Sequence, residues 1–292
     1  MSTEKKLLLC AAYPMLLSPV HQLCSDWCQR EGVFHTVCDH VFDKGVGAVL
    51  SMSLSELQVT ALNALLAEHT QVNALLLDAE KLADLKLFVF DMDSTLIDAE
   101  VIDELAHYAD VQDEVQRITA SAMRGDIDFN ESFQQRVVLL KGIQRSALSD
   151  IASRLPFMPG LVSLFSGLNE RGIKTAIVSG GFQYFADYLK QTLDANYAFA
   201  NELEVDGEYL TGVSVGEVVD PYKKREILKR LAQEEGLELQ QCVAVGDGAN
   251  DLLMLEAAGI GIAFHAKPYL KERSQYHLDE VGLDALLALL PA

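Results

Sequence analysis

The chain has 292 residues, of which 50% are apolar and 23% charged, a composition typical of a soluble globular protein with room for one large domain or two to three smaller ones. Its 43 acidic residues outnumber the 23 basic ones, and the resulting net charge of −20 repels phosphate backbones, which excludes nucleic acid as a favourable partner. No segment approaches the roughly 20 uninterrupted apolar residues that span a bilayer, so we also expect no membrane partner.

The N-terminal stretch MSTEKKLLLCAAYPMLLSP places two lysines before a short apolar run, which faintly resembles a secretory signal. Pro14 interrupts that run, Glu4 lies in the charged part, and no clear small-residue cleavage pattern follows. The five cysteines are an odd number without a paired CxxC spacing, which argues against a disulfide framework. A zinc pair of Cys24 and Cys28 is the alternative to buried or incidental thiols, which are favoured. We therefore expect a cytoplasmic chain.

Residues 1–82 predict a small α+β accessory domain that carries no recognisable chemistry. Residues 7–17 (LLLCAAYPMLL) and 47–55 (GAVLSMSLS) indicate strands, whereas 55–69 and 72–85 have the apolar spacing of helices. The second of these helices would connect the accessory domain to the rest of the chain.

From residue 83 onward the pattern predicts a Rossmann-like α/β core, a parallel sheet with helices on both faces. Short apolar strands lie at 87–90, 174–180, 241–247 and 260–264, and helical stretches separate the later ones. Residues 202–218 alternate around Asp206-Gly207 and indicate a β-hairpin beside the sheet.

An insertion at about 98–157 interrupts this alternation. It has helical apolar spacing and is far longer than an ordinary crossover between strands. We predict a helical cap over the carboxyl ends of the strands.

Three of the four apolar strands end in polar residues, and the carboxyl ends of parallel strands share the edge where ligands bind. Asp91 and Asp93 follow the first strand, Ser179 and Gly180 end the second, and GDGAND follows the third. Carboxylates without His or Cys suit a hard cation such as Mg²⁺, with Asp91, Asp247 and the backbone carbonyl of Asp93 as candidate ligands.

The same residue types suit phosphoryl transfer. Asp91 could attack phosphorus and form an aspartyl phosphate, while Asp93 could protonate the leaving oxygen and then activate water. The N–H groups near Gly180 and the hydroxyl of Ser179 could hold phosphoryl oxygens, and Lys223 or Lys224 could offset the charge. Each motif alone also fits a simple turn, an N-cap or a solvated lysine, but the three turns together favour function.

Four stretches carry a resemblance to a known family: DMDSTLID, AIVSGGF, a lysine near 224 and AVGDGAND. In this order they resemble the four motifs of the haloacid dehalogenase-like phosphotransferase superfamily, and the likeness covers about 86–290. Glu100, AMRGDIDF (122–129) and QQRVVLLKG (134–142) extend it to members that hydrolyse O-phospho-L-serine. The resemblance implies a Mg²⁺-dependent phosphoric monoester hydrolase that releases L-serine and phosphate, the last step of serine biosynthesis.

The resemblance also implies roles for particular residues. Leu228 selects Lys224 over Lys223, because the family keeps a leucine four residues after its lysine. Glu100 and Arg136 match residues that read the amino and carboxylate ends of the substrate, which also makes chemical sense for a zwitterion. The matched set comprises Asp91 as nucleophile, Asp93 as acid/base, Asp91, Asp93 and Asp247 as metal ligands, Ser179, Gly180, Lys224 and Asn250 as substrate contacts, and Asp251, Met123 and Phe129 as auxiliary residues.

Two rival hypotheses remain at this point. One is a phosphatase or phosphotransferase for another small phosphorylated metabolite. The other is a regulatory binding protein, in which residues 1–82 sense an amino acid and the acidic loop only holds an ion. A homodimer is a further expectation from the resemblance.

Overall fold

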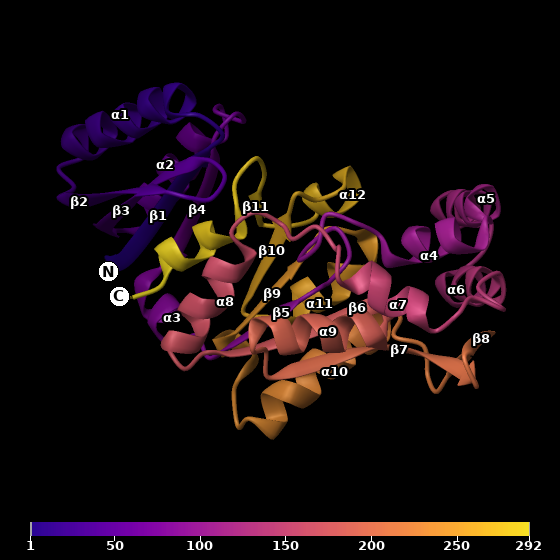
Figure 1. Cartoon of the computed structure of the whole chain (residues 1–292). Coiled ribbons are helices and arrows are strands. Elements are labelled where there is room, and N and C mark those ends of the chain that lie inside the picture. Colours follow the sequence, from indigo (N-terminus) through magenta and orange to yellow (C-terminus); the bar gives the residue numbers. More distant parts are fainter. Residues whose placement is uncertain (1, 292) are drawn as a thin grey trace.

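The computed structural model describes residues 2–291, which form two β-sheets covered by helices (Figure 1). The first sheet is antiparallel, has the order β2-β3-β1-β4, and lies with its helices in the N-terminal part of the chain. Its elements are β1 (Thr3–Ala11), α1 (Pro14–Arg30), β2 (His35–Val41), β3 (Val46–Leu54), α2 (Glu56–Leu66) and β4 (Asn73–Asp78), and α3 (Ala79–Ala83) leads to the second sheet.

Among the predictions for this region, one was correct only in part and another was wrong. The strand predicted for 7–17 ends at Ala11, because Pro14 occupies the first turn of α1, where its fixed φ and missing N–H cost nothing. The helix predicted for 72–85 is instead β4 followed by the single short helix α3. Leu75 and Leu77 pack toward the second sheet while Leu76 packs toward α1 and α2, so both faces of β4 accept apolar side chains.

The second sheet has the order β11-β10-β9-β5-β6-β7-β8, and all its neighbouring strands are parallel except the β7–β8 hairpin. The predicted α/β fold class and hairpin are confirmed. Its strands are β5 (Leu87–Phe90), β6 (Lys174–Phe182), β7 (Tyr197–Asp206), β8 (Tyr209–Val215), β9 (Cys242–Gly246), β10 (Ile260–Phe264) and β11 (Tyr276–Leu278).

Helices cover both faces of this sheet because its central strands are apolar on both faces. Phe88 and Phe90 of β5 belong to the core formed with α8 and α9, whereas Leu87 and Val89 belong to the core formed with α10 and α11. The helices are α8 (Leu161–Glu170), α9 (Gln183–Leu193), α10 (Pro221–Glu234), α11 (Leu252–Ala257) and α12 (Pro268–Lys271), with 3₁₀ turns η1 (Leu239–Gln241), η2 (Ala249–Asp251) and η3 (Leu283–Leu289).

Four helices lie between β5 and α8, where the sequence predicts a cap. They are α4 (Val101–Ala109), α5 (Gln112–Met123), α6 (Phe129–Val138) and α7 (Ser146–Ala152). The two chain segments that enter and leave this cap pair with each other, since Ile97 bridges Phe157 and the N–H of Met158 donates to the carbonyl of Leu96 (2.9 Å). The β7–β8 hairpin also binds the cap, through the bond from the N–H of Leu210 in β8 to the carbonyl of Ile143 (2.9 Å).

Within residues 2–291, none of the helices combines the length and the apolar character that crossing a membrane requires.

Candidate active site

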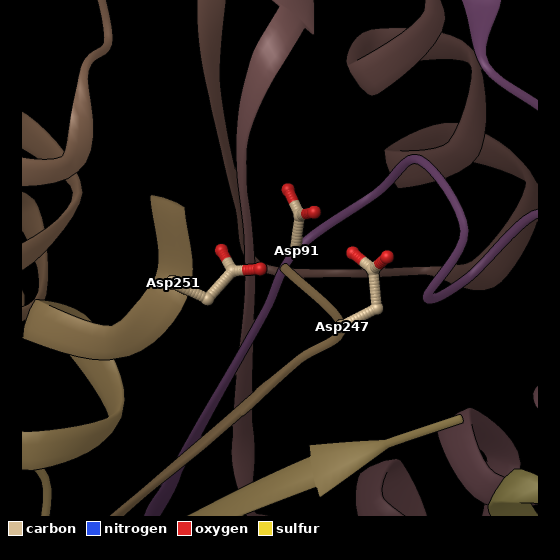
Figure 2. Close-up of side chains that lie close together, drawn as sticks. All are labelled: Asp91, Asp247 and Asp251. Carbon is tan, nitrogen blue, oxygen red and sulfur yellow. The ribbon is translucent and has the colours of Figure 1, made fainter. Parts of the chain in front are cut away.

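Three aspartates from two neighbouring strands gather at the carboxyl edge of the second sheet (Figure 2). Asp91 follows β5, Asp247 follows β9, and Asp251 ends the turn η2 beyond β9. Each offers a carboxylate oxygen, and these atoms all lie within 4.8 Å of one another. Gly246 allows the close approach, because a Cβ at this position would lie 2.5 Å from Cγ of Asp251. All three side chains are buried.

Asp93 points away from that cluster, toward the end of β6. One of its oxygens accepts the N–H of Val101 (2.9 Å), and the other accepts the hydroxyl of Ser179 (3.3 Å). Ser179 in turn accepts the N–H of Gly181 (2.8 Å). The Asp93 carboxylate is therefore oriented by the entry to the cap on one side and by the SGG turn on the other, and only its backbone carbonyl remains a candidate metal ligand. The SGG turn is formed by Ser179, Gly180 and Gly181 at the end of β6, where the pairing with β7 shifts register.

Lys224 places its ammonium group between two of the clustered carboxylates. Nζ lies 2.5 Å from Oδ1 of Asp91 and 2.8 Å from Oδ1 of Asp251, and the side chain is fully buried. Its neighbour Lys223 points outward to Glu217 (2.7 Å) and Glu226 (3.1 Å). Of the two adjacent lysines, Lys224 is thus the one within reach of the reacting groups.

The carboxylates at this edge are short of positive charge. Burial raises the pKa of Asp91, and Asp251 raises it further, against the opposing effect of Lys224. Burial followed by Asp251 likewise raises the pKa of Asp247 to about 6. Burial lowers the pKa of Lys224, but Asp251 and Asp91 outweigh this effect and the net pKa is raised, so the lysine stays charged. Lys224 and Lys267, whose Nζ lies 3.0 Å from Oδ2 of Asp247, supply two positive charges against three buried carboxylates, and an all-oxygen cluster of this kind fits a hard divalent cation.

The cap contributes residues that face the same edge. Glu100 stands directly before α4 and accepts the hydroxyl of Ser94 (3.0 Å). Burial lowers the pKa of Arg136, while the charges of Glu100, Asp103 and Asp93 raise it. These three carboxylates therefore interact electrostatically with the Arg136 guanidinium.

Two apolar cap residues and one loop residue complete the predicted set. A Cβ on Gly180 would lie 3.1 Å from the ring of Phe129, so this ring lies over the SGG turn. Asn250 lies in η2 with its side-chain oxygen against Gly248. Met123 ends α5, and its side chain lies outside the described residues.

Two residues at the site are absent from the sequence-based set. Asn201 donates its amide to the carbonyls of Gly180 (2.8 Å) and Gly181 (3.1 Å), and its Oδ1 accepts the N–H of Val219 (2.8 Å). Lys267 lies 3.0 Å from Oδ2 of Asp247 and 3.6 Å from Oε1 of Glu100. The signal for Lys267 was present, because it follows the fourth apolar strand as the other polar residues follow the first three.

Comparison with known proteins places the chain in a family. The sequence model of haloacid dehalogenase-like hydrolases matches residues 85–259. A phosphoserine phosphatase of Archaeoglobus fulgidus is 48% identical over 205 residues, and the alignment covers 70% of this chain but only 60% of that protein. A phosphoserine phosphatase of Haemophilus influenzae is 47% identical over 212 residues, with 73% of this chain and 68% of that protein covered.

A solved structure resembles both sheets together. A haloacid dehalogenase family hydrolase from Salmonella enterica superposes with a TM-score of 0.85 at 28% identity and covers 98% of each chain. Because the family model matches more than half of the chain, and the Haemophilus protein is covered over more than two thirds of its length, this chain belongs to the haloacid dehalogenase-like hydrolases and, within them, to the phosphoserine phosphatase family.

Proposed function

We propose that the chain hydrolyses O-phospho-L-serine to L-serine and phosphate, the last step of serine biosynthesis, through an aspartyl phosphate on Asp91. The observation that carries this proposal is the placement of Asp91 and Asp93 at one strand end in different surroundings. Asp91 lies 2.5 Å from the Lys224 ammonium, which opposes the rise in the Asp91 pKa caused by burial and Asp251 and so favours the ionised nucleophile, whereas no side chain among the described residues forms an ion pair with Asp93.

In the first half-reaction, Asp91 Oδ attacks phosphorus and the bond from phosphorus to the serine oxygen breaks. Burial, followed by the charge of Glu100, raises the pKa of Asp93 to about 7, so this group holds a proton that it can give to the departing serine oxygen. In the second half-reaction the resulting Asp93 carboxylate removes a proton from water, whose oxygen attacks the phosphorus. The bond from phosphorus to the Asp91 oxygen breaks, phosphate leaves, and the Asp91 carboxylate and protonated Asp93 are restored.

The phosphoryl oxygens have a prepared set of donors. Ser179 and the N–H groups of the SGG turn lie beside Asp93, and Asn201 holds two carbonyls of that turn and thereby fixes where its N–H groups point. Lys224 offsets charge on the attacking carboxylate.

Asp91, Asp247 and the backbone carbonyl of Asp93 would hold Mg²⁺, with Asp251 fixing Lys224 beside them. When bound, this ion neutralises the acidic cluster and stabilises negative charge on the phosphoryl group. The choice of Mg²⁺ is supported by an all-oxygen set of few ligands, which leaves positions for water.

Substrate choice is assigned to the cap. An amino acid phosphate presents an ammonium and a carboxylate beyond its phosphate, and Glu100 and Arg136 supply the opposite charges. Glu100 raises the pKa of Asp93, and Asp93 raises the pKa of Arg136, so both cap residues interact with the group that would protonate the serine oxygen. The amino and carboxylate groups of phosphoserine lie close to this oxygen and need partners there.

A phosphate-release assay tests the proposal. The wild-type chain is incubated with O-phospho-L-serine, with phosphorylated sugars and with a simple alkyl phosphate, each with and without Mg²⁺. We expect Mg²⁺-dependent release that favours phosphoserine, and we expect Asp91→Asn to remove nearly all of it while the chain stays folded. Appreciable turnover by Asp91→Asn would refute the nucleophile, and preference for a phosphate without an amino group would refute the substrate.

Two further assignments accompany this function. The five free cysteines support a reducing cytoplasmic compartment.

The β2 edge supports a homodimer, because its outer backbone has no partner strand among the described residues and Phe34 and Val41 are 84% and 86% exposed beside it. Fractionation and sedimentation equilibrium test these two assignments.

A further inference from the structure

Lys267 connects the acidic cluster of the core with the first residue of the cap. Its Nζ lies 3.0 Å from Oδ2 of Asp247 and 3.6 Å from Oε1 of Glu100. The side chain is 48% exposed, as for many surface lysines, but both of its partners belong to the proposed active site. Lys267 is the one lysine besides Lys224 that forms ion pairs with these carboxylates in the part of the chain that the structure describes.

The backbone holds this lysine in place from two sides. Its N–H donates to the backbone carbonyl of Asp247 (2.8 Å), so the same two residues are joined by main chain and by side chain. The following residue, Pro268, begins α12 and restricts Lys267 to the extended conformation that it adopts, with φ −62° and ψ 149°. This frame fixes the backbone from which the Lys267 side chain extends to Asp247.

Lys267 and the acidic cluster meet at the carboxylate of Asp247. The ammonium of Lys267 engages Oδ2 of Asp247, and Asp247 also offers a carboxylate oxygen within 4.8 Å of oxygens from Asp91 and Asp251.

The consequence concerns how Asp247 can bind a metal. With Oδ2 engaged by an ammonium group, one oxygen remains for the ion. Mg²⁺ prefers near-ideal octahedral geometry with few protein ligands and several waters, which one oxygen per carboxylate satisfies. Ca²⁺ takes six to eight oxygens at longer distances and accepts both oxygens of a carboxylate.

We propose that Lys267 is a metal-selectivity residue, which holds Oδ2 of Asp247, keeps this carboxylate a one-oxygen ligand, and so favours Mg²⁺ over Ca²⁺. The inference rests on the proposed function only in requiring that the acidic cluster binds a divalent cation. It does not depend on which phosphate ester is hydrolysed.

Calorimetric titration of the full chain with MgCl₂ and with CaCl₂, in the absence of substrate, tests the inference. In Lys267→Met both metals should bind more tightly, because a competing cation is gone, but Ca²⁺ should gain about tenfold more than Mg²⁺, the order of one additional charge-assisted contact. Lys267→Gln should behave in the same way, and Lys267→Arg should retain the wild-type ratio of the two dissociation constants.

Lys271→Met is the matched control. This lysine ends the short helix α12, which directly follows Lys267, is 42% exposed, and forms an ion pair of 2.6 Å with Asp279 outside the acidic cluster. Its loss should leave both dissociation constants unchanged. Thermal unfolding of each metal-free variant verifies that the chains compared are folded.

Three outcomes overturn the inference: no change in Lys267→Met, an equal gain for both metals, and an equal change in Lys271→Met. An equal gain for both metals would mean that Lys267 acts only as a distant charge. Phosphoserine turnover is measured separately with Mg²⁺, so its absence would refute the proposed function while leaving the metal selectivity of Lys267 to be judged by calorimetry alone.

Discussion

Replacing Lys224 by methionine removes the only side-chain cation that contacts both Asp91 and Asp251 within the described residues. Methionine has nearly the same length and keeps the apolar packing of α10, so the change isolates the loss of charge. Two carboxylates that are 5% and 0% exposed would then lack their partner. Breaking a buried ion pair from one side costs about 3–5 kcal/mol of folding free energy, and we expect that loss in the metal-free chain at pH 7.5.

The pH dependence of the folding free energy shows whether the lost ion pair causes the destabilisation. Without Lys224, the folded-state pKa of Asp91, which burial already raises, would lie still further above its unfolded value, so the folded variant would bind more protons than its unfolded form. Stability must then fall as pH rises above about 4 and recover as pH is lowered. Mg²⁺ should restore part of the loss, because it supplies the missing positive charge and binds only the folded state.

Urea unfolding at pH 5.5 and 7.5, with and without Mg²⁺, measures these effects. Lys223→Met is the matched control, since this lysine precedes Lys224 on the same helix and pairs with Glu217 and Glu226 at the surface. A surface ion pair contributes about 0–1 kcal/mol to the folding free energy. A Lys224→Met chain that loses no more stability than Lys223→Met, or that is less stable at pH 5.5 than at 7.5 relative to wild type, would refute the reasoning.

Two further predictions concern the reaction. In single-turnover experiments, the rate of serine release should fall above pH about 7, where Asp93 loses its proton. Glu100→Gln should move this fall in rate to lower pH, because the charge of Glu100 is the second cause of the raised pKa of Asp93. A pH profile that Glu100→Gln leaves in place would contradict that cause. Arg136→Ala should raise the KM for phosphoserine about tenfold to a hundredfold and leave the KM for O-phosphoethanolamine, which lacks the carboxylate, nearly unchanged. An equal rise in KM for both substrates would contradict recognition of the carboxylate by Arg136.

Much of the site can be predicted from sequence because parallel strands deliver their carboxyl ends to one edge. Asp91, Ser179 and Asp247 are far apart in the chain, yet each follows an apolar run, and β5, β6 and β9 are neighbours in the sheet. The same rule applied to the fourth strand, β10, leads to Lys267 three residues beyond its end. Its partners could not be predicted, because a lysine side chain reaches in many directions and the frame set by Asp247 and Pro268 exists only in three dimensions.

The helical periodicity of the α10 sequence is a second signal, which distinguishes Lys224 from Lys223. Lys224, Ile227, Leu228 and Leu231 recur with helical spacing and are all buried, so Lys224 lies on the apolar stripe and Lys223 does not. Periodicity fails for β4, where the apolar residues of NALLLD fit a helix as well as a strand buried on both faces. The choice there is made by pairing with β1, which no local pattern encodes.

The charges at the sheet edge explain why the ion should be divalent. Five carboxyl groups lie there with three cationic side chains, and with Asp93 holding the proton that the first half-reaction requires, the formal charge of the group is −1. A divalent ion makes this total +1, which attracts a phosphate ester, whereas a monovalent ion leaves no net positive charge to do so. The groups counted are Asp91, Asp93, Asp247, Asp251 and Glu100 against Lys224, Lys267 and Arg136.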